Sequence, residues 1–110
     1  MIYAQSGVSC SKLAKYAAMR GAASAAFLAG IPGTVGGALA MNAGAFGGQT
    51  WAHVVSVECL SRQGVRSVYP AREFNVGYRQ VSGPGAMFVG AWFEFSDLGG
   101  PDQSAQIKQL

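Results

Sequence analysis

The sequence predicts an α+β fold in which an antiparallel sheet of about four strands is flanked by helices. Three observations support this fold class. Residues 53–61, 65–69 and 86–95 are rich in β-branched and aromatic side chains and alternate along the chain, as strands do. Residues 9–20 instead place apolar side chains at helical spacing. Short glycine- and proline-containing loops separate these segments, so that neighbouring strands can pair as hairpins.

The N-terminal segment is predicted to form a strand followed by a helix. Residues 1–8 form a short segment rich in apolar side chains, which suits a strand. Ser9 or Ser11 can cap a helix that runs to about Arg20, and Gly21 suits the left-handed residue that follows a helix. The side chains that should face the core at the i, i+3 and i+4 positions are Leu13, Tyr16 and Ala17.

A charge-free, glycine-dense stretch follows at residues 28–48, after a small-residue segment at 22–29 that can form a helical turn. Pro32-Gly33 is a turn signal, and Thr34 is suited to cap a short helix that ends near Met41. The amides of Gly36 and Gly37 are expected to be free at the start of this helix. Such a terminus suits an anion or an electron-rich ring edge.

Three structures are compatible with this stretch. The first is a small-residue helix packed tightly against a sheet. The second is a membrane span, because residues 21–46 carry no charge; glycine in a helix interior and the Pro32-Gly33 break disfavour it. The third is a turn that cradles a ligand, since glycine lets a ligand approach the backbone closely. Composition alone leaves the first and third open.

The second half of the chain reads as a hairpin followed by a long strand. Residues 53–61 place Val55, Val57 and Cys59 on one face, Gly64 lies in the turn, and 65–69 form the return strand. Pro70 stops this strand, and residues 71–74 form a short turn that directs Phe74 inward. After a loop at 82–85, both faces of the strand at 86–95 are apolar, so it should be central.

The C-terminal residues are predicted to be a polar loop at 97–103, with a helix that starts at Pro101 and continues through Ile107 and Leu110.

Composition limits the classes of protein to consider. Half of the 110 residues are hydrophobic and 12% are charged, which argues for one folded domain and against disorder. The net charge is +3 and the basic residues are spread out, so no nucleic-acid interface is expected. Cys10, Cys59 and His53 lack metal-ligand spacing, and the two cysteines are expected to be free thiols. The absence of a signal-peptide pattern favours the cytoplasm.

Two motifs carry a resemblance to a known family. Residues 29–38 read Ala-Gly-Ile-Pro-Gly-Thr-Val-Gly-Gly-Ala, and residues 41–47 read Met-Asn-Ala-Gly-Ala-Phe-Gly. Together with Tyr78-Arg79 they closely resemble the UDP-N-acetylenolpyruvoylglucosamine reductase family, within the FAD-linked oxidase (PCMH-type) superfamily. The resemblance spans about residues 3–98. It implies a flavoenzyme of peptidoglycan synthesis that reduces UDP-N-acetylglucosamine enolpyruvate to UDP-N-acetylmuramate, with FAD as cofactor and NADPH as reductant.

The resemblance also implies site residues. Arg79 matches the catalytic arginine that contacts the enolpyruvyl carboxylate and stabilises enolate-like charge, and Tyr78 matches a residue of the UDP-sugar substrate pocket. Taken alone, an arginine beside a tyrosine could simply reach out to water. The positions expected to line the cofactor are Gly30, Ile31, Pro32, Gly33, Thr34, Gly36, Gly37, Asn42 and Gly44.

The family pattern further implies that the chain is a fragment of a larger enzyme. Residues 1–98 correspond to the second lobe of the FAD-binding domain, and 99–110 to a linker and the start of a helix toward a substrate-binding domain. A first FAD-binding lobe is expected before residue 1 and the proton-donor serine after residue 110, so the fragment alone is expected to be inactive and to self-associate through exposed apolar surface. The alternatives are another FAD-linked oxidoreductase of the superfamily and a non-catalytic interaction domain.

Overall fold

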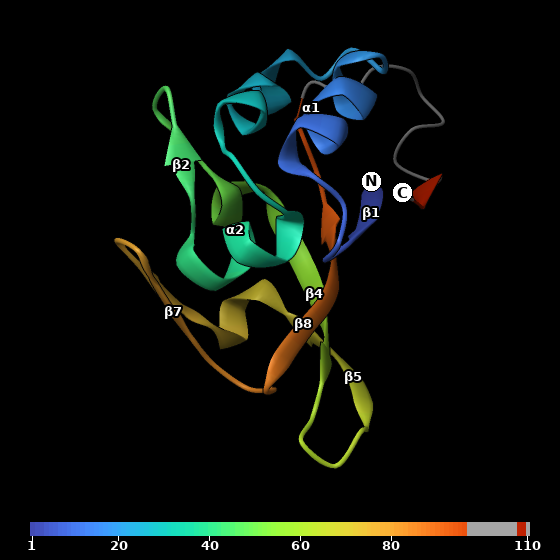
Figure 1. The fold of residues 1–110 in the computed structure, drawn as a ribbon, viewed down its shortest axis with the longest axis vertical. Helices are drawn as coiled ribbons and strands as arrows, with labels where there is room; N and C mark the ends of the chain where they lie inside the picture. The colour runs from blue at the N-terminus through green and yellow to red at the C-terminus, as the bar shows by residue number, and fades with distance from the viewer. Residues whose placement is uncertain (97–107, 110) are drawn as a thin grey trace.

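The computed structural model describes residues 1–96 and 108–109, and its centre is a five-stranded sheet in the order β5-β4-β8-β1-β9 (Figure 1). Each neighbouring pair among β5, β4, β8 and β1 is antiparallel, whereas β9 runs parallel to β1. The predicted α+β class with four antiparallel strands is therefore confirmed. The bounds are β1 Ile2–Gln5, β4 Val54–Leu60, β5 Arg66–Pro70, β8 Met87–Phe93 and β9 Lys108–Gln109.

The remaining elements are short helices and two small hairpins. The helical elements are α1 Cys10–Ala18, η1 Ala23–Gly30, α2 Val35–Met41, η2 Thr50–His53 and η3 Ala71–Glu73, of which the η elements are 3-10 helices. The separate two-stranded sheets pair β2 Gly44–Ala45 with β3 Gly48–Gln49, and β6 Asn75–Gly77 with β7 Gln80–Ser82. Neither hairpin was predicted, because strands of two or three residues are too short to show alternation.

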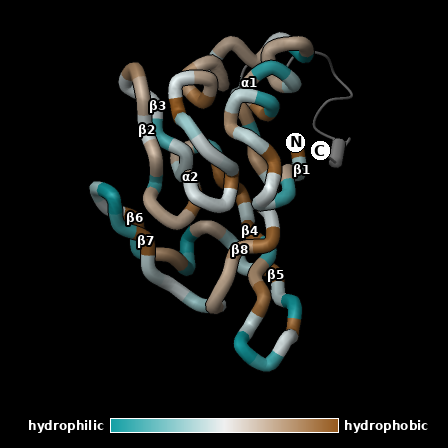
Figure 2. Tube along the Cα trace, in the orientation of Figure 1, coloured by the Kyte–Doolittle hydropathy of each residue, from teal (hydrophilic) through white to brown (hydrophobic). Residues whose placement is uncertain are grey.

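The hydrophobic core lies between the helices and one face of the sheet. Figure 2 shows hydrophobic residues gathered where β4 and β8 lie together, and hydrophilic residues at the tip of the β4–β5 loop. Burial of these apolar side chains supplies the main driving force for the fold. The larger core residues are Ile2, Leu13, Leu28, Val35, Leu39, Val57, Phe93 and Phe95.

The predicted first helix is confirmed as α1. The Ser9 hydroxyl accepts a hydrogen bond from the Lys12 amide at 3.1 Å, which makes Ser9 the N-cap. Leu13 and Ala17 are fully buried, and Tyr16 is half-buried beside the core. The last helical residue is Ala18, and Gly21 has the positive φ of 89° that ends the turn.

The β4–β8 ladder contains two irregularities, and the first makes the predicted face of the strand at 53–61 partly wrong. One extra residue in β4 at Val55 leaves that side chain 37% exposed, so Val54 is buried in its place. An extra residue in β8 at Val89 turns Met87 outward and lets Phe88 pack on the core. A one-residue slip moves every later side chain to the opposite face, and alternation in the sequence does not reveal it.

The two ends of the described chain also differ from expectation. β1 stops at Gln5 because the chain turns there, with the Val8 amide donating to the Gln5 carbonyl at 3.1 Å. The carbonyls of residues 8 and 6 then accept from the amides of Val35 and Gly36. The predicted polar loop and most of the C-terminal helix lie outside the described residues. At Lys108–Gln109 the helix prediction is wrong, since these residues form β9 and pair with the edge of β1.

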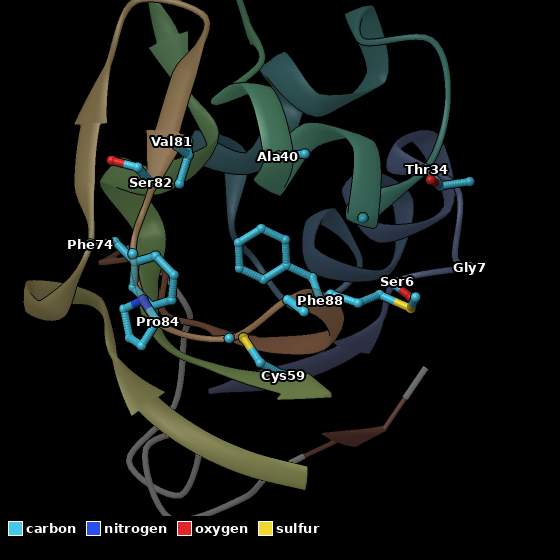
Figure 3. A pocket seen from close by; sticks show the side chains of 15 residues that line it. Ser6, Gly7, Thr34, Ala40, Cys59, Phe74, Val81, Ser82, Pro84 and Phe88 are labelled. Carbon is cyan, nitrogen blue, oxygen red and sulfur yellow. The ribbon is translucent and has the colours of Figure 1, made fainter. Parts of the chain in front are cut away.

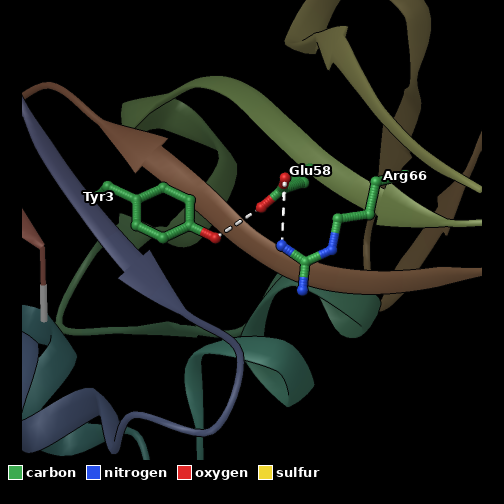
Figure 4. Close-up of polar contacts among 3 residues, drawn as sticks. All are labelled: Tyr3, Glu58 and Arg66. Atoms are coloured by element: carbon green, nitrogen blue, oxygen red, sulfur yellow. Dashed lines mark hydrogen bonds and ion pairs between the residues drawn. The ribbon is translucent and has the colours of Figure 1, made fainter.

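The face of the sheet opposite the core carries a small polar cluster (Figure 4). The Tyr3 hydroxyl donates to Glu58 Oε1 at 2.8 Å, and Arg66 Nη1 lies 3.6 Å from Glu58 Oε2. The Trp92 ring packs on Tyr3 with a centroid separation of 4.6 Å. Burial first, and then the hydrogen bond to Glu58, raises the pKa of Tyr3 from 10.0 to about 12.

This raised pKa predicts how stability changes at alkaline pH. The folded state holds the Tyr3 proton more tightly than the unfolded state, so its contribution is fully present below pH 10.0 and is lost as the pH rises toward about 12. The Tyr3→Phe variant should lose less free energy of unfolding across this window than the parent chain. Urea unfolding at several alkaline pH values measures the difference; equal losses would contradict the prediction.

Candidate functional site

A cavity of about 650 Å³ opens between the start of α2 and the segment that joins β7 to β8. Its size is typical of small-molecule sites, which span roughly 300–1,000 Å³. In Figure 3, Ser6 and Thr34 lie on one side and Val81 and Ser82 on the other, with Phe88 between them. One wall is therefore small and polar, and the opposite wall includes apolar rings and a glycine-rich loop.

The polar wall is built from two turns that are bonded to each other. One turn follows β1 at residues 6–10, and the other precedes α2 at residues 33–36. Ser9 and Thr34 form an isolated β-bridge between them. The backbone bonds are Cys10 N to Gly33 O at 3.0 Å, Val35 N to Val8 O at 2.8 Å and Gly36 N to Ser6 O at 2.9 Å. Both turns are thus fixed as one unit.

These bonds correct one prediction and confirm another. The amide of Gly36 is not free, since it donates to Ser6 O, and the amide of Gly37 donates to the Thr34 hydroxyl oxygen at 3.4 Å. Free amides at the start of α2 were therefore wrongly predicted, because the neighbouring turn occupies the position expected for a ligand. Thr34 is the N-cap of α2, as predicted.

The Thr34 cap is expected to make a measurable contribution to the free energy of unfolding. Replacing Thr34 with alanine removes the acceptor for the Gly37 amide, which should lower the free energy of unfolding by about 1 kcal/mol. Thr34→Ser keeps the hydroxyl and should retain most of this free energy. Urea denaturation of the three proteins measures both effects. Equal stability of Thr34→Ala and Thr34→Ser would show that the cap does not stabilise α2.

The glycines of this region have different roles. A Cβ added at Gly7 or at Gly33, where φ is +104°, would meet no atom within 4 Å. The backbone there is open to approach by a flat group. At Gly36 the added Cβ would lie 2.9 Å from Ser6 Cβ, and at Gly30 it would lie 2.5 Å from the Phe46 ring. These two glycines allow close packing within the protein.

The positions predicted to line the cofactor are dispersed. Of the nine, Thr34 and Gly36 line the cavity. Ile31 is 7% exposed and belongs to the core, while Pro32 is exposed at the turn. A Cβ on Gly44 would lie 2.7 Å from the Gly48 carbonyl oxygen, so this glycine permits the β2–β3 hairpin.

The side chain of Asn42 forms hydrogen bonds with other residues of the protein. It ends α2 in the left-handed conformation, with φ 48° and ψ 56°, and is 9% exposed. Its Oδ1 accepts from the Trp51 amide at 3.0 Å, and its Nδ2 donates to Gln49 Oε1 at 2.9 Å and to the Gly77 carbonyl at 3.5 Å. The side-chain amide therefore ties α2 to η2 and to the β6–β7 hairpin.

Tyr78 and Arg79 form the two-residue tip of the β6–β7 hairpin. Both side chains are exposed, Tyr78 by 85%, and the guanidinium carbon lies 5.2 Å from the Tyr78 ring centroid. Arg79 has a positive φ of 54°. Neither residue lines the cavity, whereas Val81 and Ser82 of the same hairpin do. The tip therefore stands beside the cavity and outside its lining.

Sequence reasoning missed part of the cavity. Ser6, Phe74, Ser82 and Phe88 line it without having been predicted. The Ser6-Gly7 turn directly after a strand was a usable signal, whereas the approach of residues 82–88 depends on tertiary packing. Cys59 also lines the cavity; it is free and buried, and burial raises the pKa of its thiol, with the Glu58 carboxylate adding to the effect.

Two features are absent from the described residues, 1–96 and 108–109. No group of three or more histidine, cysteine, aspartate or glutamate side chains there could hold a metal ion. No helix in the same part of the chain has both the length and the apolar character needed to cross a membrane.

Comparison with known proteins adds a family and several relatives. The sequence model of a family described as "FAD binding domain" matches residues 1–67. UDP-N-acetylenolpyruvoylglucosamine reductase of Alkalilimnicola ehrlichii is 48% identical over 110 residues, covering 99% of this chain and 37% of the relative. The proteins of the same name from Coxiella burnetii and Methylococcus capsulatus are 50% and 49% identical, covering 94% and 99% of this chain and 33% and 36% of the relatives.

A solved structure gives a matching fold. The crystal structure of UDP-N-acetylenolpyruvylglucosamine reductase (MurB) from Thermus caldophilus aligns with a TM-score of 0.73 and 31% identity. The alignment covers 82% of this chain and 34% of that protein. The chain therefore spans about a third of the length of the relatives that it matches.

Proposed function

The chain belongs to the FAD-binding domain family, and from this premise we propose that it is part of a flavoenzyme of peptidoglycan synthesis. The enzyme reduces UDP-N-acetylglucosamine enolpyruvate to UDP-N-acetylmuramate with NADPH. Sequence identity of 48–50% to reductases of that name, over 94–99% of the chain, supports this reaction. The structural similarity to MurB supports the same assignment.

The observation that carries the proposal is the shape of the cavity wall. The two bonded turns place Gly7 and Gly36 in the wall, Gly7 has open space where a side chain would stand, and Phe74 and Phe88 line the same cavity. A flat, largely apolar ring system fits such a space, because main chain can lie against one face of it. FAD, when bound, supplies hydride transfer from its reduced ring to the substrate.

Residues of this chain have roles in binding the cofactor and the substrate. The turn at residues 30–37, with Asn42 and Gly44 behind it, supports and orients the flavin end of the cofactor. Thr34 and Gly36 stand at the cavity itself. Tyr78 contacts the UDP-sugar, and Arg79 holds the enolpyruvyl carboxylate and stabilises negative charge that develops next to it. Arginine suits this role because its planar fork matches two carboxylate oxygens and stays charged.

The domain arrangement forms part of the proposal. Residues 1–98 are the second lobe of the cofactor-binding domain, and 99–110 lead toward a substrate-binding domain. The rest of the cofactor site and the proton donor belong to segments outside this chain, so the 110-residue chain is inactive alone. The enzyme acts in the cytoplasm and contributes to cell shape and division through the cell wall.

The test expresses the chain together with the coding sequence that flanks it. We expect this extended protein to purify with a flavin absorbance spectrum and to oxidise NADPH only when the enolpyruvyl substrate is present. UDP-N-acetylglucosamine, which lacks the enolpyruvyl group, is the control and should give no oxidation. Flavin with turnover of a hydroxy acid would favour another oxidoreductase of the superfamily, and neither flavin nor turnover would favour an interaction domain.

We also propose that the 110-residue chain self-associates. Phe46, Tyr78 and Met19 are 89%, 85% and 76% exposed, and contact with a second copy would remove such apolar surface from water. Light scattering at increasing concentration should show a rising mean mass. A constant monomer mass at high concentration would contradict this part of the proposal.

A further inference from the structure

The hairpin that carries Tyr78 and Arg79 is separate from the main sheet. Its strands β6 and β7 form their own two-stranded sheet, with the pairs Asn75–Ser82, Val76–Val81 and Gly77–Gln80. An isolated two-stranded hairpin is at best marginally stable in water. The direction of the tip must therefore depend on contacts between the hairpin and the rest of the molecule.

The hairpin is attached to the rest of the protein at two positions along its length, on β7 and just before the tip. Val81 packs against the hydrophobic core and holds the side of β7. The Asn42 Nδ2 atom donates to the carbonyl of Gly77 at 3.5 Å, and Gly77 is the residue directly before the tip. The Asn42 contact is thus placed to fix the backbone from which Tyr78 and Arg79 extend.

Asn42 is a rigid point of attachment. A side-chain amide offers two N–H donors and one carbonyl acceptor, and here one N–H is directed to Gln49 Oε1, the other to Gly77 O, and the carbonyl oxygen accepts from the Trp51 amide. The residue is 9% exposed and sits at the end of α2. Its position is therefore set by α2 and η2, and the hairpin is bonded to that fixed point.

We propose that Asn42 is a positioning residue that acts on Arg79 through the Gly77 carbonyl. This role rests on the proposed function, in which Arg79 holds the substrate carboxylate. Arg79 has a φ of +54°, a conformation that non-glycine residues keep only where the surroundings hold them. Loss of the anchor lets the tip leave this conformation, and the guanidinium then points away from the carboxylate for part of the time.

The anchor is tested first on the 110-residue chain by limited trypsin digestion. Asn42→Asp keeps an acceptor for the Trp51 amide and removes the donor to Gly77 and to Gln49. Cleavage after Arg79 should become about tenfold faster, because proteolysis reports local opening, while cleavage after the exposed Arg62 should not change. Asn75→Asp is the matched control on the same hairpin and should cleave like the parent. An unchanged rate at Arg79, or an equal acceleration at both arginines, overturns the anchor.

The effect on catalysis is tested in the flank-extended enzyme by a double-mutant cycle. The variants are Asn42→Asp, Arg79→Ala and the combination, and kcat is expressed per bound flavin so that misfolded protein does not count. Asn42→Asp should lower kcat about tenfold when Arg79 is present and by no more than about twofold in the Arg79→Ala background, where only its support of the flavin-binding turn is lost. Equal losses in both backgrounds overturn the positioning role.

The two proposals fail in different ways. A parent extended protein without flavin or NADPH oxidation contradicts the proposed function. The trypsin comparison does not depend on flavin or substrate, so it still decides whether Asn42 anchors the hairpin.

Discussion

Replacing Arg79 with alanine should lower kcat of the flank-extended enzyme by about 10² to 10³-fold, with flavin content unchanged. Removing a single group that stabilises developing negative charge costs about this factor in other enzymes. Arg79 lies at an exposed two-residue hairpin tip and makes no core contact that its loss would disturb. The substitution is therefore expected to affect the proposed reaction and not the fold. The measurements are kcat, KM and bound flavin.

Two further variants sharpen this prediction. Arg79→Lys keeps the positive charge but loses the planar fork, so kcat should fall by about 10-fold or more. Arg62→Ala, at another exposed loop, is the matched control and should leave kcat unchanged. A kcat of Arg79→Ala within about twofold of the parent would remove Arg79 from the proposed mechanism.

The parts of the fold that sequence predicted are those in which local signals agree with tertiary structure. The α1 helix combines the Ser9 cap with Leu13 and Ala17 on one buried face, and the β4–β5 hairpin combines alternation with a positive-φ Gly64. In each case propensity, pattern and turn chemistry favour one structure.

The failures share a different physical cause. The bulges at Val55 and Val89, the β6–β7 hairpin and β9 depend on which strand lies alongside, and no window of sequence contains that information. At the site, the sequence correctly predicts Thr34 as a cap but wrongly predicts a free Gly36 amide. Its actual partner, the Ser6 carbonyl, lies thirty positions earlier in the chain, so only the folded structure reveals it.

The free energy of unfolding should depend strongly on where a single methyl group is added to the cavity wall. At Gly36 an added Cβ would lie 2.9 Å from Ser6 Cβ and 3.2 Å from the Ser6 carbonyl oxygen, which is backbone and cannot rotate away. Gly36→Ala must therefore push the turn after β1 away from α2 and weaken the bond between Gly36 N and Ser6 O. Overpacking of this kind costs about 1–3 kcal/mol. We expect the free energy of unfolding to fall by that amount, measured by urea denaturation.

The next residue provides the control, because the same substitution there meets no obstacle. A Cβ at Gly37 would lie 3.8 Å from the Thr34 hydroxyl oxygen, an ordinary contact, and alanine is a better helix former than glycine by up to about 1 kcal/mol. Gly37→Ala should thus leave stability unchanged or raise it, although both positions are in the first turn of α2. In the extended enzyme, Gly36→Ala should also release flavin more readily, since Gly36 lines the cavity and its partner Ser6 lines the same wall. Equal effects of the two substitutions would mean that helix propensity, rather than contact between the two turns, decides stability here, and the bonded-turn description of the cavity wall would be wrong.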